Sequence, residues 1–151
     1  MFYIFKHIPY FYGQIFNLPK VYMKERYIEN DYAEIWYEDG IIYEIFKPNT
    51  VLSLAAANKV LDDRLNVSNK QICPIFVDIK HLIHADNKAK KLFSSVEGLQ
   101  YLNAGAFVID NYLSRLAFNI FMRIFKPVIP TRSFPDRESA VKWLQHYKFP
   151  N

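Results

Sequence analysis

The clearest pattern along the chain is an alternation of apolar and polar residues from Tyr32 to Glu38, followed by a second extended run over Ile41–Phe46. Asp39 and Gly40 separate the two runs. Both central residues of a type I′ turn need positive φ, which an Asp-Gly pair adopts at low cost. The pattern therefore predicts an antiparallel hairpin.

A helical pattern follows this hairpin. Pro48–Thr50 interrupts the second strand, and Ser53 is placed to cap a helix, with its hydroxyl accepting from a free N–H of the first turn. Asn66–Gln71 has the composition of a polar connection. The predicted inward face of the helix consists of Leu54, Ala57, Leu61 and Leu65.

The rest of the predicted fold is arranged around the stretch Pro74–Asp86. Ile75–Ile79 is short, almost entirely apolar and partly β-branched, which favours a strand covered on both faces. After Asp86, which occupies an N-cap position, the spacing becomes helical. The apolar residues of this predicted helix are Ala89, Leu92, Phe93, Val96 and Leu99.

Two more strand and helix pairs complete the pattern. Ala104–Ile109 predicts a buried strand, and Asp110 or Asn111 caps the apolar helix Tyr112–Phe125. An edge strand over 128–134 and a last helix capped by Asp136 follow. This order implies an α/β fold with a mixed sheet, in which an antiparallel hairpin precedes parallel βαβ units with about four helices.

The helix 112–125 is apolar on more than one side. Its main apolar face predicts a deeply covered crossover helix. The alternative is a self-association surface or the wall of an apolar pocket, involving Phe118, Met122 and Phe125, which lie beyond that face. The main face consists of Leu113, Leu116, Ala117, Ile120, Phe121 and Ile124.

Composition limits the class of protein. The chain of 151 residues is 51% hydrophobic and 17% aromatic, which excludes a disordered chain and favours a single core. With Cys73 as the only cysteine, no intrachain disulfide is possible, and we expect a cytoplasmic protein. The net charge is only +4, and Met23–Lys47 is acidic, so we expect no binding of nucleic acid.

Residues 1–22 differ from the rest because they are rich in Phe and Tyr and contain no Asp or Glu. Pro9, Gly13 and Pro19 interrupt any helix there, so neither a signal peptide nor a membrane span fits. One interpretation is an upstream extension of a protein that starts at Met23. The other is an aromatic arm that packs on a neighbour or touches a membrane surface. We expect a single domain over 23–151.

The order of elements and the segment 75–89 resemble the STAS domains of anti-sigma-factor antagonists, in which a central strand leads into a helix that opens with Asp-Ser-Ser-Gly. Residues from about Ala33 to Tyr147 resemble uncharacterised bacterial STAS-like (SpoIIAA-like) proteins more closely. Their pattern runs from an Asp-Gly hairpin to a Pro-aliphatic-Pro-Thr-Arg-hydrophobic-Phe segment, here 127–134. The resemblance implies a regulatory or protein-interaction module, expected to be a homodimer.

The chain departs from the STAS pattern at the phosphorylation site. Asn87 and Lys88 occupy the positions of the two serines, and neither accepts a phosphate in that way. The first turn of this helix is instead basic, which suggests a constant contact site for an acidic protein partner. The residues of this predicted site are Asp86, Asn87, Lys88, Lys90 and Lys91. Solvated lysines on an exposed helix face are the simpler interpretation.

Residues suited to catalysis are few. Asp78, His81, His84 and Asp86 are the densest reactive set, but they provide too few ligands for a metal site. The sequence contains no nucleophile elbow and no phosphate-binding glycine loop, and Cys73 lacks an orienting group. We therefore expect a non-enzymatic module without a cofactor. A carrier of a lipid or other apolar molecule, as in the SEC14-like relatives of the fold, is the alternative, and an enzyme using Asp78, His84 and Asp86 is a third hypothesis.

Overall fold

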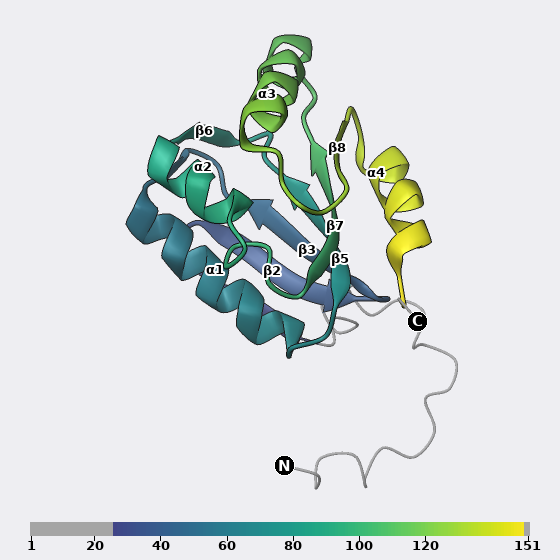
Figure 1. The fold of residues 1–151 in the computed structure, drawn as a ribbon. Helices are drawn as coiled ribbons and strands as arrows, with labels where there is room; N and C mark the ends of the chain where they lie inside the picture. Colours follow the sequence, from purple (N-terminus) through teal and green to yellow (C-terminus); the bar gives the residue numbers. More distant parts are fainter. Residues whose placement is uncertain (1–25, 150–151) are drawn as a thin grey trace, which may run out of the picture.

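The computed structural model describes residues 26–149, which form a mixed sheet with helices on both faces (Figure 1). The elements are β1 (Arg26–Glu29), β2 (Ala33–Glu38), β3 (Ile41–Phe46), β4 (Thr50–Leu52), α1 (Leu54–Ser68), β5 (Cys73–Asp78), β6 (Leu82–Ala85), α2 (Asn87–Ser94), β7 (Leu102–Val108), α3 (Tyr112–Phe125), β8 (Thr131–Phe134), α4 (Arg137–Leu144) and a 3-10 turn (Gln145–Tyr147).

The main sheet has six strands in the order β1-β2-β3-β5-β7-β8. Strands β1, β2 and β3 are antiparallel neighbours, whereas β3, β5, β7 and β8 run parallel. Strands β4 and β6 form a separate parallel pair. The predicted mixed α/β fold is confirmed. Strands β1, β4 and β6, each of only three or four residues, were not predicted, and the edge strand predicted over 128–134 is confined to Thr131–Phe134.

The β2–β3 hairpin has the predicted turn. Asp39 (φ 48°) and Gly40 (φ 78°) both have positive φ, as a type I′ turn requires. The far end of the hairpin pairs Ala33 with Phe46. Lys148, near the end of the described chain, returns to the turn, with its Nζ 2.7 Å from Asp39 Oδ2.

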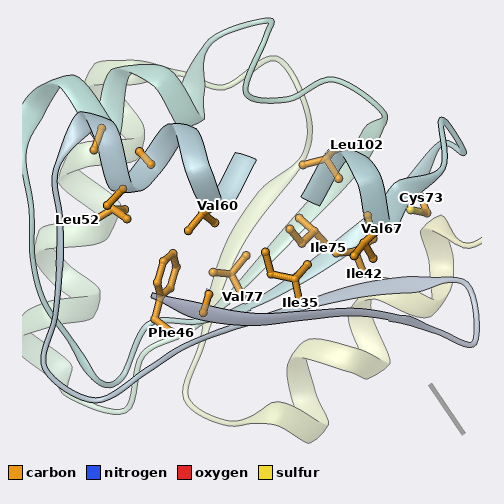
Figure 2. Packing of buried hydrophobic residues seen from close by; sticks show 14 residues of the cluster. Ile35, Ile42, Phe46, Leu52, Val60, Val67, Cys73, Ile75, Val77 and Leu102 are labelled. Carbon is orange, nitrogen blue, oxygen red and sulfur yellow. The ribbon is translucent and has the colours of Figure 1, made fainter. Parts of the chain in front are cut away.

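Each face of the sheet has its own apolar core. Helices α1 and α2 cover one face, where Ile42 and Phe46 of β3 pack with Ile75 of β5 (Figure 2). Helix α4 covers the opposite face, which receives Ile41 and Tyr43 of β3. Because successive side chains of a strand point to opposite faces, β3 contributes residues to both cores.

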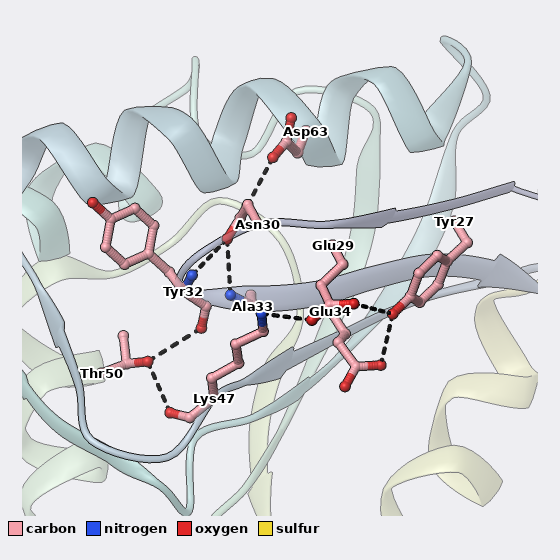
Figure 3. Close-up of polar contacts among 9 residues, drawn as sticks. All are labelled: Tyr27, Glu29, Asn30, Tyr32, Ala33, Glu34, Lys47, Thr50 and Asp63. Carbon is pink, nitrogen blue, oxygen red and sulfur yellow. Dashed lines mark hydrogen bonds and ion pairs between the residues drawn. The ribbon is translucent and has the colours of Figure 1, made fainter.

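A polar contact fixes the β1–β2 loop against α1 (Figure 3). Asn30 Oδ1 accepts hydrogen bonds from the backbone N–H groups of Tyr32 (2.8 Å) and Ala33 (2.9 Å). Asn30 Nδ2 donates to Asp63 Oδ2 on α1 at 2.7 Å, and Lys59 Nζ lies 2.8 Å from Asp63 Oδ1. One side chain therefore closes the loop and ties it to the helix.

Helix α1 begins as predicted but is longer, and its predicted inward face is buried in part. Ser53 Oγ accepts from the Ala56 N–H at 3.2 Å, so Ser53 is the N-cap. The helix continues to Ser68, which makes the first part of the predicted connection Asn66–Gln71 helical. Within the predicted inward face, Ala57 and Leu61 are buried, but Leu54 is 37% exposed.

Helix α2 is shorter than its apolar pattern predicts. Asp86 is the N-cap as predicted, since its Oδ1 accepts at 2.7 Å from the N–H three residues later. The helix ends at Ser94, and Val96 is 81% exposed. A Cβ added at Gly98 would lie 2.0 Å from the Leu92 carbonyl oxygen. The chain therefore folds back against the end of α2 where only glycine fits.

The aromatic segment 1–22 and the expected start at Met23 lie outside the described residues, so both interpretations of that segment stay predictions. Within residues 26–149, even the apolar helix α3 falls short of the length and apolarity that a bilayer crossing requires.

We expect Gly40→Ala to lower the free energy of unfolding by about 1–2 kcal/mol, because a Cβ is strained at positive φ. That Cβ would also lie 3.0 Å from Lys148 Cε. The control is Gly105→Ala on β7, where φ is not positive and alanine should add about 0.5–1 kcal/mol. Urea denaturation measures both changes. Equal effects at the two glycines would contradict the turn assignment.

Candidate functional site

A cavity of about 660 Å³ lies between the sheet and helix α3. Strands β3, β5, β7 and β8 contribute to its floor, and α2, β6 and α3 contribute to its walls. In Figure 1, α3 stands at the top of the molecule, beyond the ends of the central strands. The lining is mainly apolar and includes Ile75, Val77, Phe107, Phe118 and Met122.

Gly105 on β7 leaves space in the floor of the cavity. A Cβ added there would lie 3.5 Å from Phe107 Cε2 and 3.7 Å from the Cγ2 atoms of Ile75 and Thr131, all of which belong to lining residues. These are ordinary contact distances, so alanine fits. A larger side chain at this position would project into the cavity.

A row of aromatic rings connects the floor to α3. The ring centroids of Phe107 and Phe118 lie 4.8 Å apart, those of Phe118 and Phe121 6.3 Å, and those of Phe121 and Phe125 4.4 Å. Of the three residues predicted for a dimer or apolar ligand surface, Phe118 and Met122 line the cavity, and Phe125 extends the row.

Polar contacts hold the first turns of α3. Asn111 is the N-cap, and its Oδ1 accepts from the N–H groups of Leu113 (2.8 Å) and Ser114 (3.2 Å). Arg115 Nη1 donates to the Ile109 carbonyl at 3.1 Å. These contacts fix where the helix leaves β7, although no residue of α3 is buried.

The prediction that α3 is a deeply covered crossover helix is wrong. Most of its main apolar face is exposed, with Leu113 at 71%, Ile120 at 52% and Ile124 at 69%. Phe121 of that face nevertheless lines the cavity, together with Phe118 from beyond it. The side of α3 that is directed at the sheet is therefore its aromatic side, which overlaps only part of the predicted inward face.

A buried ion pair forms part of the cavity lining. Glu44 of β3 and Arg64 of α1 are 1% and 5% exposed, and Arg64 Nε donates to Glu44 Oε2 at 2.8 Å. Arg64 Nη1 also donates to the Gly98 carbonyl at 2.9 Å, and the guanidinium lies 5.0 Å from the centroid of the Phe93 ring. The pair is neutral as a unit and links β3, α1 and the connection after α2.

Exposed lining residues mark the mouth of the cavity on the β5–β6 connection, on β6 and at the start of α3. Exposed His84 and half-buried Lys90 line it together with Lys80. Lys80 Nζ lies 3.3 Å from Asp78 Oδ2. In the predicted partner-binding turn, the Asp86 carboxylate is bonded as the N-cap of α2, whereas Asn87, Lys88 and Lys91 are exposed.

The reactive residues of this region are not gathered into a metal site. Within residues 26–149, no group of three or more His, Cys, Asp or Glu side chains is placed to hold an ion. Asp78 accepts from the Lys80 N–H at 3.0 Å through Oδ1, and His81 and His84 are exposed. Asp78 therefore has the local bonding role predicted for it.

Cys73 is a buried thiol at the start of β5. Burial raises the pKa of this thiol to about 11, against the smaller lowering effects of the nearby Arg26 charge and a hydrogen bond with the Ile42 backbone. Its Sγ lies 3.7 Å from the Gln71 carbonyl oxygen. A thiol that stays protonated at neutral pH is a poor nucleophile.

The Pro-Thr-Arg segment has a structural role in the described chain. Arg132 lies over the ring of Phe134, 5.3 Å from its centroid. Asp136 caps α4 as predicted, since its Oδ1 accepts from the Ser139 N–H at 2.8 Å. This capping lowers the pKa of the Asp136 carboxyl.

Sequence reasoning missed the residues that define the floor, which are Glu44, Arg64 and Gly105. One signal was available: Glu44 is the only charged residue in the run Ile41–Phe46, and it shares the inward side of β3 with Phe46. A charge at an inward strand position requires a partner. Arg64 on the following helix was the candidate.

We expect Arg64→Met to lower the free energy of unfolding by about 3–5 kcal/mol, because it leaves the Glu44 carboxylate buried without a partner. The double variant Glu44→Leu/Arg64→Met removes both charges and should recover most of that loss. Chemical denaturation of both variants tests this. A double variant no more stable than Arg64→Met would show that packing, and not charge, causes the loss.

Comparisons with known proteins agree with this fold. The chain is similar to the crystal structure of an uncharacterised protein of the DUF3478 family, with a SpoIIAA-like fold, from Shewanella loihica PV-4. The TM-score is 0.54 at 17% identity, covering 78% of this chain and 98% of that one. No curated protein matches the chain. A family profile described as "domain of unknown function (DUF7793)" matches residues 35–148. The chain therefore belongs to the DUF7793 family, and its fold is SpoIIAA-like.

Proposed function

We propose that the chain is a non-catalytic STAS-like protein that binds an apolar small molecule in the cavity beneath α3. The observation that carries this proposal is the cavity itself, with a volume of about 660 Å³ and a mainly apolar lining. Pockets for small molecules usually measure about 300–1,000 Å³ and combine apolar walls with a few polar groups.

The position of the cavity in the fold supports the proposal. Strands β3, β5, β7 and β8 run parallel, and the lining includes residues at or just after the carboxyl ends of three of them, namely Phe46, Ile79 and Ile109. Open α/β sheets generally bind ligands at this edge.

The construction of the wall also supports binding. Helix α3 has no buried residue; Phe118 packs on Phe107 of the floor, and Asn119 Oδ1 accepts from the Ser133 hydroxyl of β8 at 3.3 Å. A helix with few buried contacts can be displaced at low free-energy cost. Displacement of α3 would widen the opening of the cavity for an entering molecule, which suits a carrier. The cytoplasmic location expected from the single cysteine remains part of this proposal.

We expect the full chain, purified without detergent, to carry a co-purified apolar molecule in native mass spectrometry. Gly105→Leu should bind such molecules roughly tenfold more weakly, because the added side chain occupies the floor of the cavity. Gly105→Ala is the matched control and should retain binding.

Nile red fluorescence provides a second measurement on the same three proteins. Bound dye should show enhanced emission with the wild type and Gly105→Ala and a reduced signal with Gly105→Leu. A wild-type protein without added mass, together with unchanged Nile red emission, would refute the proposal.

A second candidate is the STAS-like interaction module that the sequence predicts. Lys88 and Lys91 support it, because both are exposed and neither makes an ion pair within residues 26–149. Since Asn87 and Lys88 replace the serines of the STAS pattern, such a contact would not be switched by phosphorylation there. The homodimer expected for this module stays a prediction.

For this second candidate, we expect Lys88→Glu/Lys91→Glu to abolish capture of acidic proteins that the wild type retains from cell extract, because the reversed charge repels them. Lys142→Glu on α4 is the control, since Lys142 is also exposed but lies on another helix. Identical sets of captured proteins for the double variant and the wild type would exclude this turn as the contact site.

A further inference from the structure

We infer that the cavity ligand is an amphiphile with an anionic end, a carboxylate or a phosphate monoester on an apolar chain, and that Lys90 receives this anion. The inference rests on the proposed binding function and specifies the chemical class of the ligand. It follows from the distribution of charge around the cavity.

The floor does not select for charge. Glu44 and Arg64 line it, but the carboxylate accepts from Nε at 2.8 Å and from Nη2 at 3.4 Å of the guanidinium. The pair is neutral, so an anion placed next to Arg64 would also meet Glu44. The apolar part of a ligand suits this end, beside Phe107 and Phe118.

At the mouth, in contrast, one positive charge has no partner in the described part of the chain. Lys80 is paired with Asp78 at 3.3 Å, whereas half-buried Lys90 lines the cavity and makes no ion pair within residues 26–149. Asp86, the nearest carboxylate in sequence, is occupied as the cap of α2. Besides Glu44, the cavity is lined by one carboxylate of the described residues, that of Asp110, which is exposed to solvent just before α3.

The neighbouring residues of α2 increase the positive potential around Lys90. Lys88 and Lys91 flank Lys90 in sequence, both are exposed, and the first turn of the helix has no acidic residue. An anion beside Lys90 is therefore close to the basic segment of α2.

Partial burial makes the Lys90 contact selective. An ammonium beside apolar walls interacts more strongly with an anion than an ammonium in bulk water does, since the local dielectric constant is lower. A hydrogen bond between charged groups is also stronger than one to a neutral hydroxyl. Lys90 should therefore distinguish an anionic amphiphile from the alcohol of the same chain length.

The test is isothermal titration calorimetry of the full chain with decanoate, decyl phosphate and decan-1-ol, each below its aggregation limit. We expect both anions to bind the wild type at least about fivefold more tightly than decan-1-ol. Lys90→Met keeps the side-chain length and removes the charge, so it should abolish this preference without weakening decan-1-ol binding. Lys142→Met on α4 is the control and should retain the preference.

The two anions separate the two sources of the charge. Tighter binding of decanoate identifies a free fatty acid as the class, and tighter binding of decyl phosphate identifies a phosphate-headed lipid; both results support the inference. Equal binding of decan-1-ol and the anions, or a preference that persists in Lys90→Met, would overturn it and leave the proposed function standing. If the wild type binds none of the three probes, both the inference and the proposed function are overturned.

Discussion

The ion pair between Glu44 and Arg64 is the interaction on which the arrangement around the cavity depends. A carboxylate on the inward side of a central strand has a large desolvation cost, and only a partner at bonding distance makes it tolerable. Arg64 provides that partner and, through the Gly98 carbonyl, also positions the connection between α2 and β7. Three of the segments that border the cavity are thereby held by one guanidinium.

This pair also accounts for a charge on the buried face of α1. A helix normally turns its most apolar stripe inward. Ala57 and Leu61 of that stripe are buried as predicted, and Arg64 is buried beside them because Glu44 provides its partner. Only Leu54, the first residue of the helix, remains exposed at 37%.

The order of elements and the mixed sheet could be predicted from the sequence because the signals were local. Asp39-Gly40 encodes its own turn, and the caps Ser53, Asp86 and Asp136 bond to N–H groups within three residues. The resemblance to STAS-like proteins pointed to the same fold, and the SpoIIAA-like neighbour agrees with it.

The candidate site was less predictable, because it depends on contacts between distant segments. The partners Glu44 and Arg64 are twenty residues apart, and the end of α2 depends on how closely Gly98 approaches Leu92. For α3, periodicity gave the correct bounds. The helix is apolar on more than one side, however, and hydropathy does not show which side lies against the sheet. The sequence suggested that α3 could form the wall of an apolar pocket, but it did not show that a cavity of about 660 Å³ lies beneath the helix.

The glycine at position 105 gives this fold a simple route for divergence. Its backbone does not require glycine, and a Cβ there makes only ordinary contacts, so a longer side chain would extend from the strand into the cavity. Each added carbon would shorten the molecule that the cavity accommodates, while the ion pair and the mouth stay the same. Members of such a family could therefore evolve different ligand lengths through single substitutions at one site, with their shared architecture unchanged.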